Sequence, residues 1–148
     1  MKLQTKNFGT IEFDSNKAII FEEGIPGFNE LKKYIIIEDE EEDSPFAYLQ
    51  SIEDGGVSFI IISPFVLKQD YTIEIKDQYV AALGGGSSQD FSVFVIVTMI
   101  DKFEVATVNL VAPLIIQSET RKGMQVILEN TNYTTRHNIV ELLGQGGC

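Results

Sequence analysis

The sequence predicts a mainly β protein: a compact antiparallel β-barrel or β-sandwich with one or two short helices. Three observations support this fold class. Short segments rich in β-branched and aromatic residues recur along the chain, and turn-forming residues separate them. The apolar run over 93–100 is too short to cross a bilayer and too β-branched for a helix, which favours a strand buried on both faces. Only two segments have a helical period.

The first half of the chain is expected to form strands joined by tight turns. The segment 24–28 (Gly-Ile-Pro-Gly-Phe) has the sequence of a type II turn, because proline fixes φ and glycine follows it. Residues 28–33 are compatible with one helical turn. The clearest two-residue alternation in the chain places Tyr71, Ile73 and Ile75 on one face. We predict strands at 2–6, 10–14, 17–21, 34–38, 46–51, 57–63 and 71–76.

The second half is predicted to centre on a hairpin. The run 93–100 reverses at Asp101-Lys102 and returns as an alternating strand as far as Pro113, which marks an edge, a bulge or a corner. Residues 84–88, rich in glycine and serine, are expected to form a flexible link. The remaining predicted elements are a strand at 123–129, a helix at 77–83 capped by Asp77, and a helix from Thr134 or Thr135 to Leu143 ended by Gly144.

The size of the chain predicts one domain, over residues 1–143. Residues 144–148 (Gly-Gln-Gly-Gly-Cys) are expected to be a disordered tail or an expression remnant. No stretch approaches the roughly 20 apolar residues of a membrane span, and no apolar signal region is present at the N-terminus, so a cytoplasmic protein is expected. The single cysteine, Cys148, excludes an internal disulfide framework.

The charge balance is strongly acidic and uneven. The chain has a net charge of −11, and residues 1–75, with fifteen acidic and six basic residues, contribute −9 of it. Phosphate backbones and anionic lipid repel such a chain, so we expect no direct nucleic-acid binding and no membrane binding. Solubility and a basic protein partner are the two interpretations left. The densest acidic run, expected to be an exposed loop, consists of Glu38, Asp39, Glu40, Glu41, Glu42 and Asp43.

Sequence motifs for catalysis or cofactor binding are lacking, so we expect neither an enzyme nor a cofactor or metal protein. The only histidine, His137, cannot anchor a metal site alone, and no nucleophile motif accompanies it. The glycine-rich segment 84–88 lacks the lysine of a phosphate-binding loop. The acidic run 38–43 lacks the alternating ligands and central glycine of a calcium loop. A carboxylate pair for glycoside hydrolysis stays possible, but the sequence singles none out.

Several unusual segments occur together and in a fixed order. They are 21–28 (Phe-Glu-Glu-Gly-Ile-Pro-Gly-Phe), 44–51 (Ser-Pro-Phe-Ala-Tyr-Leu-Gln-Ser), 57–64 (Val-Ser-Phe-Ile-Ile-Ile-Ser-Pro), 106–113 (Ala-Thr-Val-Asn-Leu-Val-Ala-Pro) and 123–128 (Gly-Met-Gln-Val-Ile-Leu), with Tyr133. In this combination they resemble the flagellar assembly factor FliW family, from the first strand to about residue 138.

The resemblance implies a small β-barrel-like protein without catalytic activity. Members of the family bind CsrA, a basic RNA-binding dimer that represses translation of flagellin messenger RNA, and they also bind flagellin. Flagellin held on FliW leaves CsrA free to repress translation. When flagellin is exported, FliW captures CsrA and flagellin synthesis resumes. Two alternatives are a flagellin-specific export chaperone without a CsrA role, and a small-ligand-binding or hydrolytic β-barrel with a deep polar pocket.

The acidic run and a few apolar segments are the candidate binding sites. The carboxylates at 38–43 are expected to steer the basic partner, since complementary potentials raise association rates. Amphipathic flagellin segments need an apolar docking surface. Structural roles are the alternative: glycines 24 and 27 serve the turn, the amide at 109 bonds backbone at the corner, and the phenylalanines fill the core. The apolar candidates are Ile25, Phe28, Pro45, Phe46, Asn109, Leu110 and Pro113.

Overall fold

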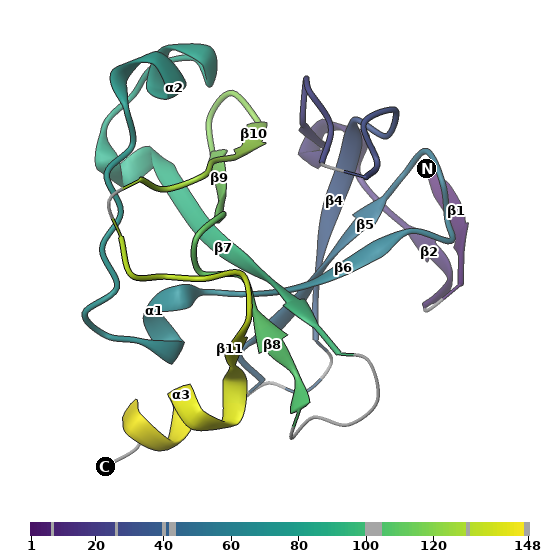
Figure 1. The fold of residues 1–148 in the computed structure, drawn as a ribbon. Coiled ribbons are helices and arrows are strands. Elements are labelled where there is room, and N and C mark those ends of the chain that lie inside the picture. Colours follow the sequence, from purple (N-terminus) through teal and green to yellow (C-terminus); the bar gives the residue numbers. More distant parts are fainter. Residues whose placement is uncertain are drawn as a thin grey trace.

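The structure, a computed structural model, describes residues 1–146 apart from 7, 26, 40, 42, 43, 100–104 and 130. The described strands, in chain order, are β1 (Lys2–Thr5), β2 (Gly9–Glu12), β3 (Ile19–Ile20), β4 (Lys33–Glu38), β5 (Phe46–Ser51), β6 (Ser58–Ile62), β7 (Phe91–Thr98), β8 (Thr107–Val108), β9 (Leu114–Gln117), β10 (Lys122–Gln125) and β11 (His137–Asn138). The described α-helices are α1 (Pro64–Leu67), α2 (Asp77–Ala82) and α3 (Ile139–Gly146), with 3-10 turns at Ser15–Lys17 and Ser88–Asp90 (Figure 1).

Seven strands form a closed barrel, which confirms the predicted fold class. Their order is β7-β6-β5-β4-β3-β10-β9, and β9 pairs again with β7. Neighbouring strands are antiparallel except β3 and β10, which pair in parallel at Ile20 and Lys122. The interior is filled by a single apolar cluster, because alternate residues of each strand point inward. Its buried members are Ile19, Phe21, Ile25, Tyr34, Leu49, Ile61, Leu114 and Ile116.

Strand β7 is the centre of the barrel, but it is not half of a regular hairpin. One of its edges pairs with β6 and the other with β8 and then β9. Between β8 and β9 the chain leaves β7, because the Leu110 N–H donates to Thr134 O and the Ala112 N–H donates to Asn109 Oδ1. The predicted continuous second strand is therefore wrong, whereas the interruption expected at Pro113, as an edge, bulge or corner, is confirmed: residues 110–112 bend and β9 begins at Leu114. The predicted reversal at Asp101-Lys102 lies outside the described residues.

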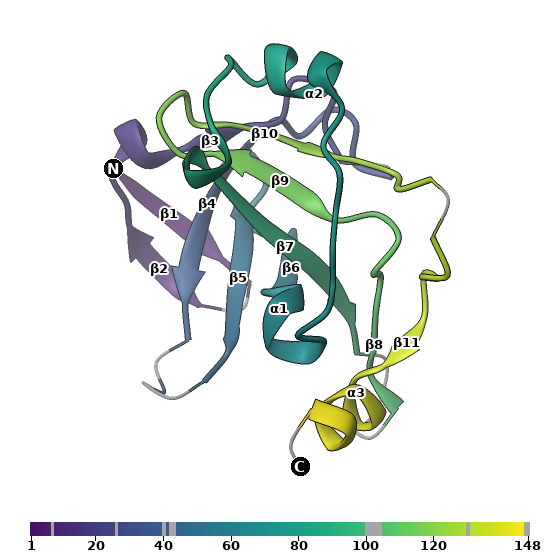
Figure 2. The same cartoon turned by 90° about the vertical axis from the view of Figure 1, so that its left-hand side faces the viewer.

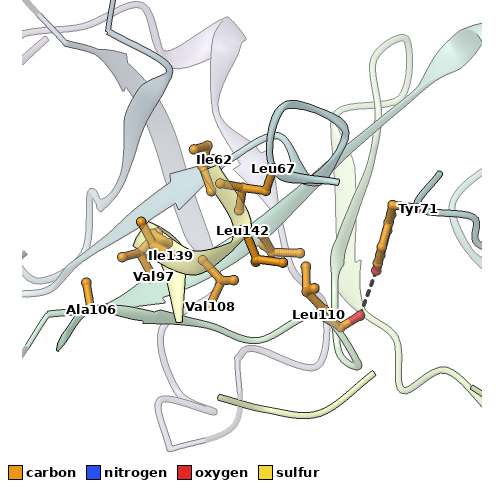
Figure 3. Packing of buried hydrophobic residues seen from close by; sticks show 10 residues of the cluster. Ile62, Leu67, Tyr71, Val97, Ala106, Val108, Leu110, Ile139 and Leu142 are labelled. Carbon is orange, nitrogen blue, oxygen red and sulfur yellow. Dashed lines mark hydrogen bonds between the residues drawn. The ribbon is translucent and has the colours of Figure 1, made fainter. Parts of the chain in front are cut away.

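Three layers cover the outside of the barrel. The β1–β2 hairpin lies against β5, where the Phe8 and Tyr48 rings meet edge to face at 5.0 Å. Helices α1 and α3 cover β6, β7 and β8, and Figure 3 shows Leu67, Ile139 and Leu142 packed together with residues of these strands. Helix α2 and the segment 71–76 cover β7, β9 and β10.

The segment 71–76 is not a sheet strand, so that prediction is wrong. Its residues alternate between the interior and solvent as predicted, but none has a neighbouring strand within the part of the chain that the structure describes. Figure 2 shows the segment running from α1 to α2 across the outer face of β7 and β9. Packing on a face produces the same alternation of burial as pairing at an edge, which explains the misassignment.

Other boundaries also differ from prediction. Residues 28–33 contain a tight turn at 29–30 and the start of β4 in place of the predicted helical turn, and β3 keeps only two residues of the predicted strand 17–21. Helix α3 begins at Ile139 and not at 134, because the Asn138 side chain accepts the Glu141 N–H at 2.9 Å and caps the helix there. It extends to Gly146. None of the described helices is long and apolar enough to span a membrane.

Candidate protein-binding site

The acidic run forms the connection between β4 and β5. Glu38 is the last residue of β4, and Glu41 is exposed in the loop. The Asp39 carboxylate accepts hydrogen bonds from the Ser44 hydroxyl at 2.9 Å and from the Glu41 N–H at 3.3 Å. Asp39 therefore shapes the loop, while the side chains of Glu38 and Glu41 are exposed and make no hydrogen bond to another described residue. The predicted contributions of Glu40, Glu42 and Asp43 lie outside the described residues.

An apolar strip runs beside this loop on the outer face of the barrel. The register aligns Tyr48 with Ile37 and Ile60, and Phe46 with Ile62, so these side chains share the face opposite the barrel interior. Ile37, Phe46, Tyr48 and Ile60 are half-buried. The strip extends from the β1–β2 hairpin, which contacts Tyr48, to α1, whose Leu67 packs in the same cluster as Phe46.

The carboxylates lie close to this strip. Burial raises the pKa of the Tyr48 hydroxyl, and the negative charges of Asp39 and Glu41 raise it further. We define the acidic face as the strip of Ile37, Phe46, Tyr48 and Ile60 together with Glu38, Asp39, Glu41 and the exposed Pro45. An apolar centre with a charged rim is the usual composition of a protein–protein interface.

The turn at 24–28 lies at the other end of β4 from the acidic run. Phe28 is 39% exposed and packs edge to face on Phe59 at 5.3 Å. Six residues of β4 separate the two regions, which is about 20 Å of strand, so Phe28 and the acidic face are separate surfaces. Ile25 is only 2% exposed and belongs to the barrel interior, so it offers no surface to a partner. The expectation of an exposed Ile25 is corrected accordingly.

The residues at 109–113, where the chain bends away from β7, are buried or half-buried. Leu110 is completely buried and Pro113 is buried, so the expectation that they form a docking surface is corrected. Asn109 has the structural role considered as its alternative, because its Oδ1 accepts the Ala112 N–H at 3.0 Å. In this bend, hydrogen bonds to the C-terminal segment replace pairing with β7, and Leu110 joins the core.

Helix α1 was missed by the sequence analysis, and it exposes apolar side chains. Phe65 and Val66 are 45% and 50% exposed. Pro64 directly after Ser63 is a recognised helix start, since proline is favoured at the first helical position, and this signal could have located the helix. Phe65 begins a row of aromatic contacts: it meets Tyr71 at 5.8 Å, and Tyr71 stacks on Tyr133 at 4.7 Å.

Two titratable groups outside the acidic face, Glu53 and His137, have structural partners. Glu53 accepts the N–H groups of Lys32 and Lys33 at 2.6 and 2.9 Å, and these bonds lower its carboxyl pKa. His137 Nε2 accepts the Thr134 N–H at 2.8 Å, and burial followed by the charge of Lys68 lowers the pKa of its imidazole. Among the described residues no three His, Cys, Asp or Glu side chains are grouped so as to hold a metal ion.

Comparison with known proteins gives one consistent family. The sequence model of the FliW protein family matches residues 2–139. The flagellar assembly factor FliW of Caldanaerobacter subterraneus subsp. tengcongensis is 47% identical over 143 residues, which cover 97% of this chain and 95% of that protein. FliW of Thermoanaerobacter pseudethanolicus is 43% identical over the same shares of the two chains. A crystal structure of a flagellar assembly factor FliW superposes with a TM-score of 0.86 at 38% identity, covering 94% of this chain and 96% of that one.

Proposed function

Because this chain belongs to the FliW family of flagellar assembly factors, we propose that it is a non-enzymatic regulator that binds the protein CsrA and flagellin in alternation. CsrA bound to this chain no longer represses flagellin messenger RNA, and flagellin bound to this chain releases CsrA. The acidic face is the observation that supports the proposal best. It combines an apolar centre with the exposed carboxylates of Glu38 and Glu41, which have no ion-pair partner among the described residues, as a basic protein partner requires.

Electrostatic steering is the proposed basis for capturing CsrA. The described chain pairs Glu12, Glu22, Asp70 and Glu129 with lysines, but it gives Glu38 and Glu41 no ion-pair partner. Their charge is therefore available to a basic protein approaching from solvent. Complementary potentials raise the association rate more than they slow dissociation, so the rate of capture is the informative quantity.

Flagellin is proposed to compete for part of the same surface. Its amphipathic segments would place apolar side chains on Pro45 and Phe46, at the edge of the acidic face, and mutual exclusion follows from this overlap. Phe28, on the separate surface at the start of β4, stays a prediction for a second flagellin contact.

A charge-reversal experiment tests the CsrA proposal. The double variant Glu38→Lys/Glu41→Lys should lower the CsrA association rate constant about tenfold at low salt, and it should change the dissociation rate little. The measurement is stopped-flow fluorescence over a series of salt concentrations. The matched control is Glu23→Lys/Glu30→Lys, which makes the same change of net charge at exposed positions before β4.

The outcomes separate the candidate functions. Equal rates for both double variants would mean that net charge and not the acidic face steers the partner. A chain that binds flagellin normally and ignores CsrA would be an export chaperone. The absence of binding heat with both CsrA and flagellin in titration calorimetry would contradict the proposed partner switch. Prior saturation with flagellin should reduce CsrA capture in proportion to occupancy.

A further inference from the structure

The segment 72–76, called the strap here, has backbone hydrogen bonds at its two ends but none at its three central residues within the described part of the chain. The Thr72 N–H donates to the Tyr133 hydroxyl at 3.3 Å. Within the part of the chain that the structure describes, Ile73, Glu74 and Ile75 make no backbone hydrogen bond. The strap is nevertheless extended, with half-buried Ile73 and Ile75 alternating with exposed residues. It is therefore a single strand, and the edge that carries the backbone groups of Ile73 and Ile75 is open.

One edge of the strap borders an apolar cavity. The backbone groups of alternate residues in a strand point to the same edge. Because Thr72 points toward Tyr133, the N–H and C=O groups of Ile73 and Ile75 point to the opposite edge. A cavity of about 460 Å³ lies there, and none of its lining side chains is charged. It is lined by Phe65, Ile73, Ile75, Val80, Gly86, Ser87, Phe91 and Val93.

We propose that this edge of the strap is a docking site for an extended segment of another protein, which adds to Ile73 and Ile75 as a second strand. An extended segment fits the edge because it satisfies the open N–H and C=O groups, which a helix does not. Alternate side chains of the segment would enter the cavity and must be apolar, because the cavity offers no charged partner.

The acidic charges around the strap favour basic residues in the docked segment, at the positions between its apolar residues. Glu74 is exposed at the middle of the strap, and exposed Asp77 begins α2 directly after it. Lys76 Nζ lies 3.1 Å from Glu129 on the far edge, so its charge is already paired. Opposite charges across a strand pair are favourable and like charges are not. The occupant is therefore a segment in which apolar residues alternate with lysine or arginine.

This site is separate from the acidic face and does not depend on the partner switch. Helix α1 lies between them, since Leu67 packs with Phe46 whereas Phe65 lines the cavity. Two partners can thus be held at once, one on each side of α1.

Synthetic peptides provide the first test. A fluorescent peptide of about eight residues that alternates isoleucine with lysine should bind the full chain, as measured by anisotropy. The isoleucine–glutamate peptide should bind about tenfold more weakly because it places like charges opposite Glu74 and Asp77. Methylation of the strap-facing amide nitrogens should abolish binding of the lysine peptide. Equal binding of the methylated peptide would overturn the proposal, because simple charge attraction would then explain the association.

Variants of the chain provide the second test. Val80→Trp fills the cavity from α2 and should weaken binding of the lysine peptide about tenfold. Gln78→Trp, on the exposed side of α2, should leave this affinity unchanged. Glu74→Lys should reverse the preference between the two peptides. Sedimentation of the chain alone should show a monomer. A dimer that Val80→Trp dissociates would overturn the proposal, because a second copy would then occupy the edge.

Discussion

At the scale of single residues, the turn before β4 depends on backbone conformations that favour glycine. Gly27 has φ +90°, and the Phe28 N–H donates to Ile25 O at 2.7 Å, as expected of a type II turn. Gly24 has φ +71°, and a Cβ there would lie 2.6 Å from the backbone of Asn29. Both glycines therefore have a structural explanation, and neither needs a partner to account for it.

Two buried tyrosines differ in what their hydroxyls bond. The Tyr71 hydroxyl donates to Leu110 O at 2.7 Å, shown as the dashed line in Figure 3. The buried Tyr34 hydroxyl has no hydrogen-bond partner among the described residues. A buried polar group without a partner costs stability, whereas one with a partner contributes to it.

Removing the two hydroxyls should therefore have opposite effects. Tyr71→Phe should lower the free energy of unfolding by about 1–2 kcal/mol, because it leaves the Leu110 carbonyl unpaired. Tyr34→Phe should leave the free energy of unfolding unchanged or raise it by up to about 1 kcal/mol. Chemical denaturation at neutral pH measures both. A large loss in Tyr34→Phe would reveal a partner for that hydroxyl.

The same variants report on stability at alkaline pH. Burial, with a smaller effect of Glu53, raises the pKa of Tyr34 from 10.0 to about 12 in the folded chain. Because of the raised pKa, the Tyr34 hydroxyl stays protonated to a higher pH in the folded state than in the unfolded state. Stability is therefore intact below pH 10 and is lost as the pH rises from 10 toward 12. Tyr34→Phe should lose less stability over this interval than the unmodified chain, and an identical slope would contradict this assignment.

At the scale of elements, α3 depends on the residue that precedes it. Asn138 is in β11 and at the same time caps α3, so one side chain sets the boundary between a strand and a helix. Ile139 and Leu142 of α3 pack against α1 and the outer face of β7. Loss of the cap should therefore loosen both the helix and the cluster beneath it.

Substitution of the cap tests this role. Asn138→Ala should lower the free energy of unfolding by about 1 kcal/mol, whereas Asn138→Asp, which keeps the acceptor oxygen, should cost much less. Circular dichroism during denaturation is the measurement. Equal losses in both variants would assign the effect to other contacts of Asn138.

Local patterns predicted the elements whose neighbours in sequence are also neighbours in space. The β1–β2 hairpin, the β5–β6 hairpin and the turn at Gly27 were predictable because local residues determine them. The strap and the interruption between β8 and β9 were not predictable from local sequence, because contacts between residues far apart in the chain determine which segments pair. Tyr71, Ile73 and Ile75 alternate as predicted, but they pack on the sheet and do not extend it.

The candidate site was only partly accessible to sequence reasoning for the same reason. The exposure of Glu38 and Glu41 was predictable because the carboxylates of a dense acidic run repel one another and stay in solvent. Leu110 and Ile25 were misjudged, since an apolar residue in a turn carries no local sign of the core that covers it. The strip beside the carboxylates combines residues from three strands, and only the register reveals that they share a face.

At the scale of the whole molecule, net charge dominates the electrostatics. The chain carries −11, and its four described lysine–carboxylate pairs are largely exposed and thus contribute little. Repulsion among the carboxylates therefore opposes the compact state, while the same charge is proposed to attract a basic partner.

Salt should consequently act in opposite directions on stability and on binding. Between roughly 0.01 M and 0.15 M NaCl the screening length falls from about 30 to about 8 Å, so the melting temperature of the free chain should rise by a few degrees. Over the same range CsrA capture should slow. Scanning calorimetry and stopped-flow fluorescence measure the two effects. A melting temperature that falls with salt would mean that the surface ion pairs outweigh the repulsion.

The parallel pairing of β3 with β10 has a consequence for synthesis on the ribosome. The strand that closes the barrel, β10, is synthesised late, because Ile20 of β3 pairs with Lys122. A nascent chain that ends before β10 therefore keeps the outer edge of β3 open while the first four barrel strands are already available to pair. Open edges invite association between chains. Neighbouring ribosomes on one messenger RNA would thus carry incomplete barrels with open edges. Rapid completion of each chain shortens the time during which these edges can associate.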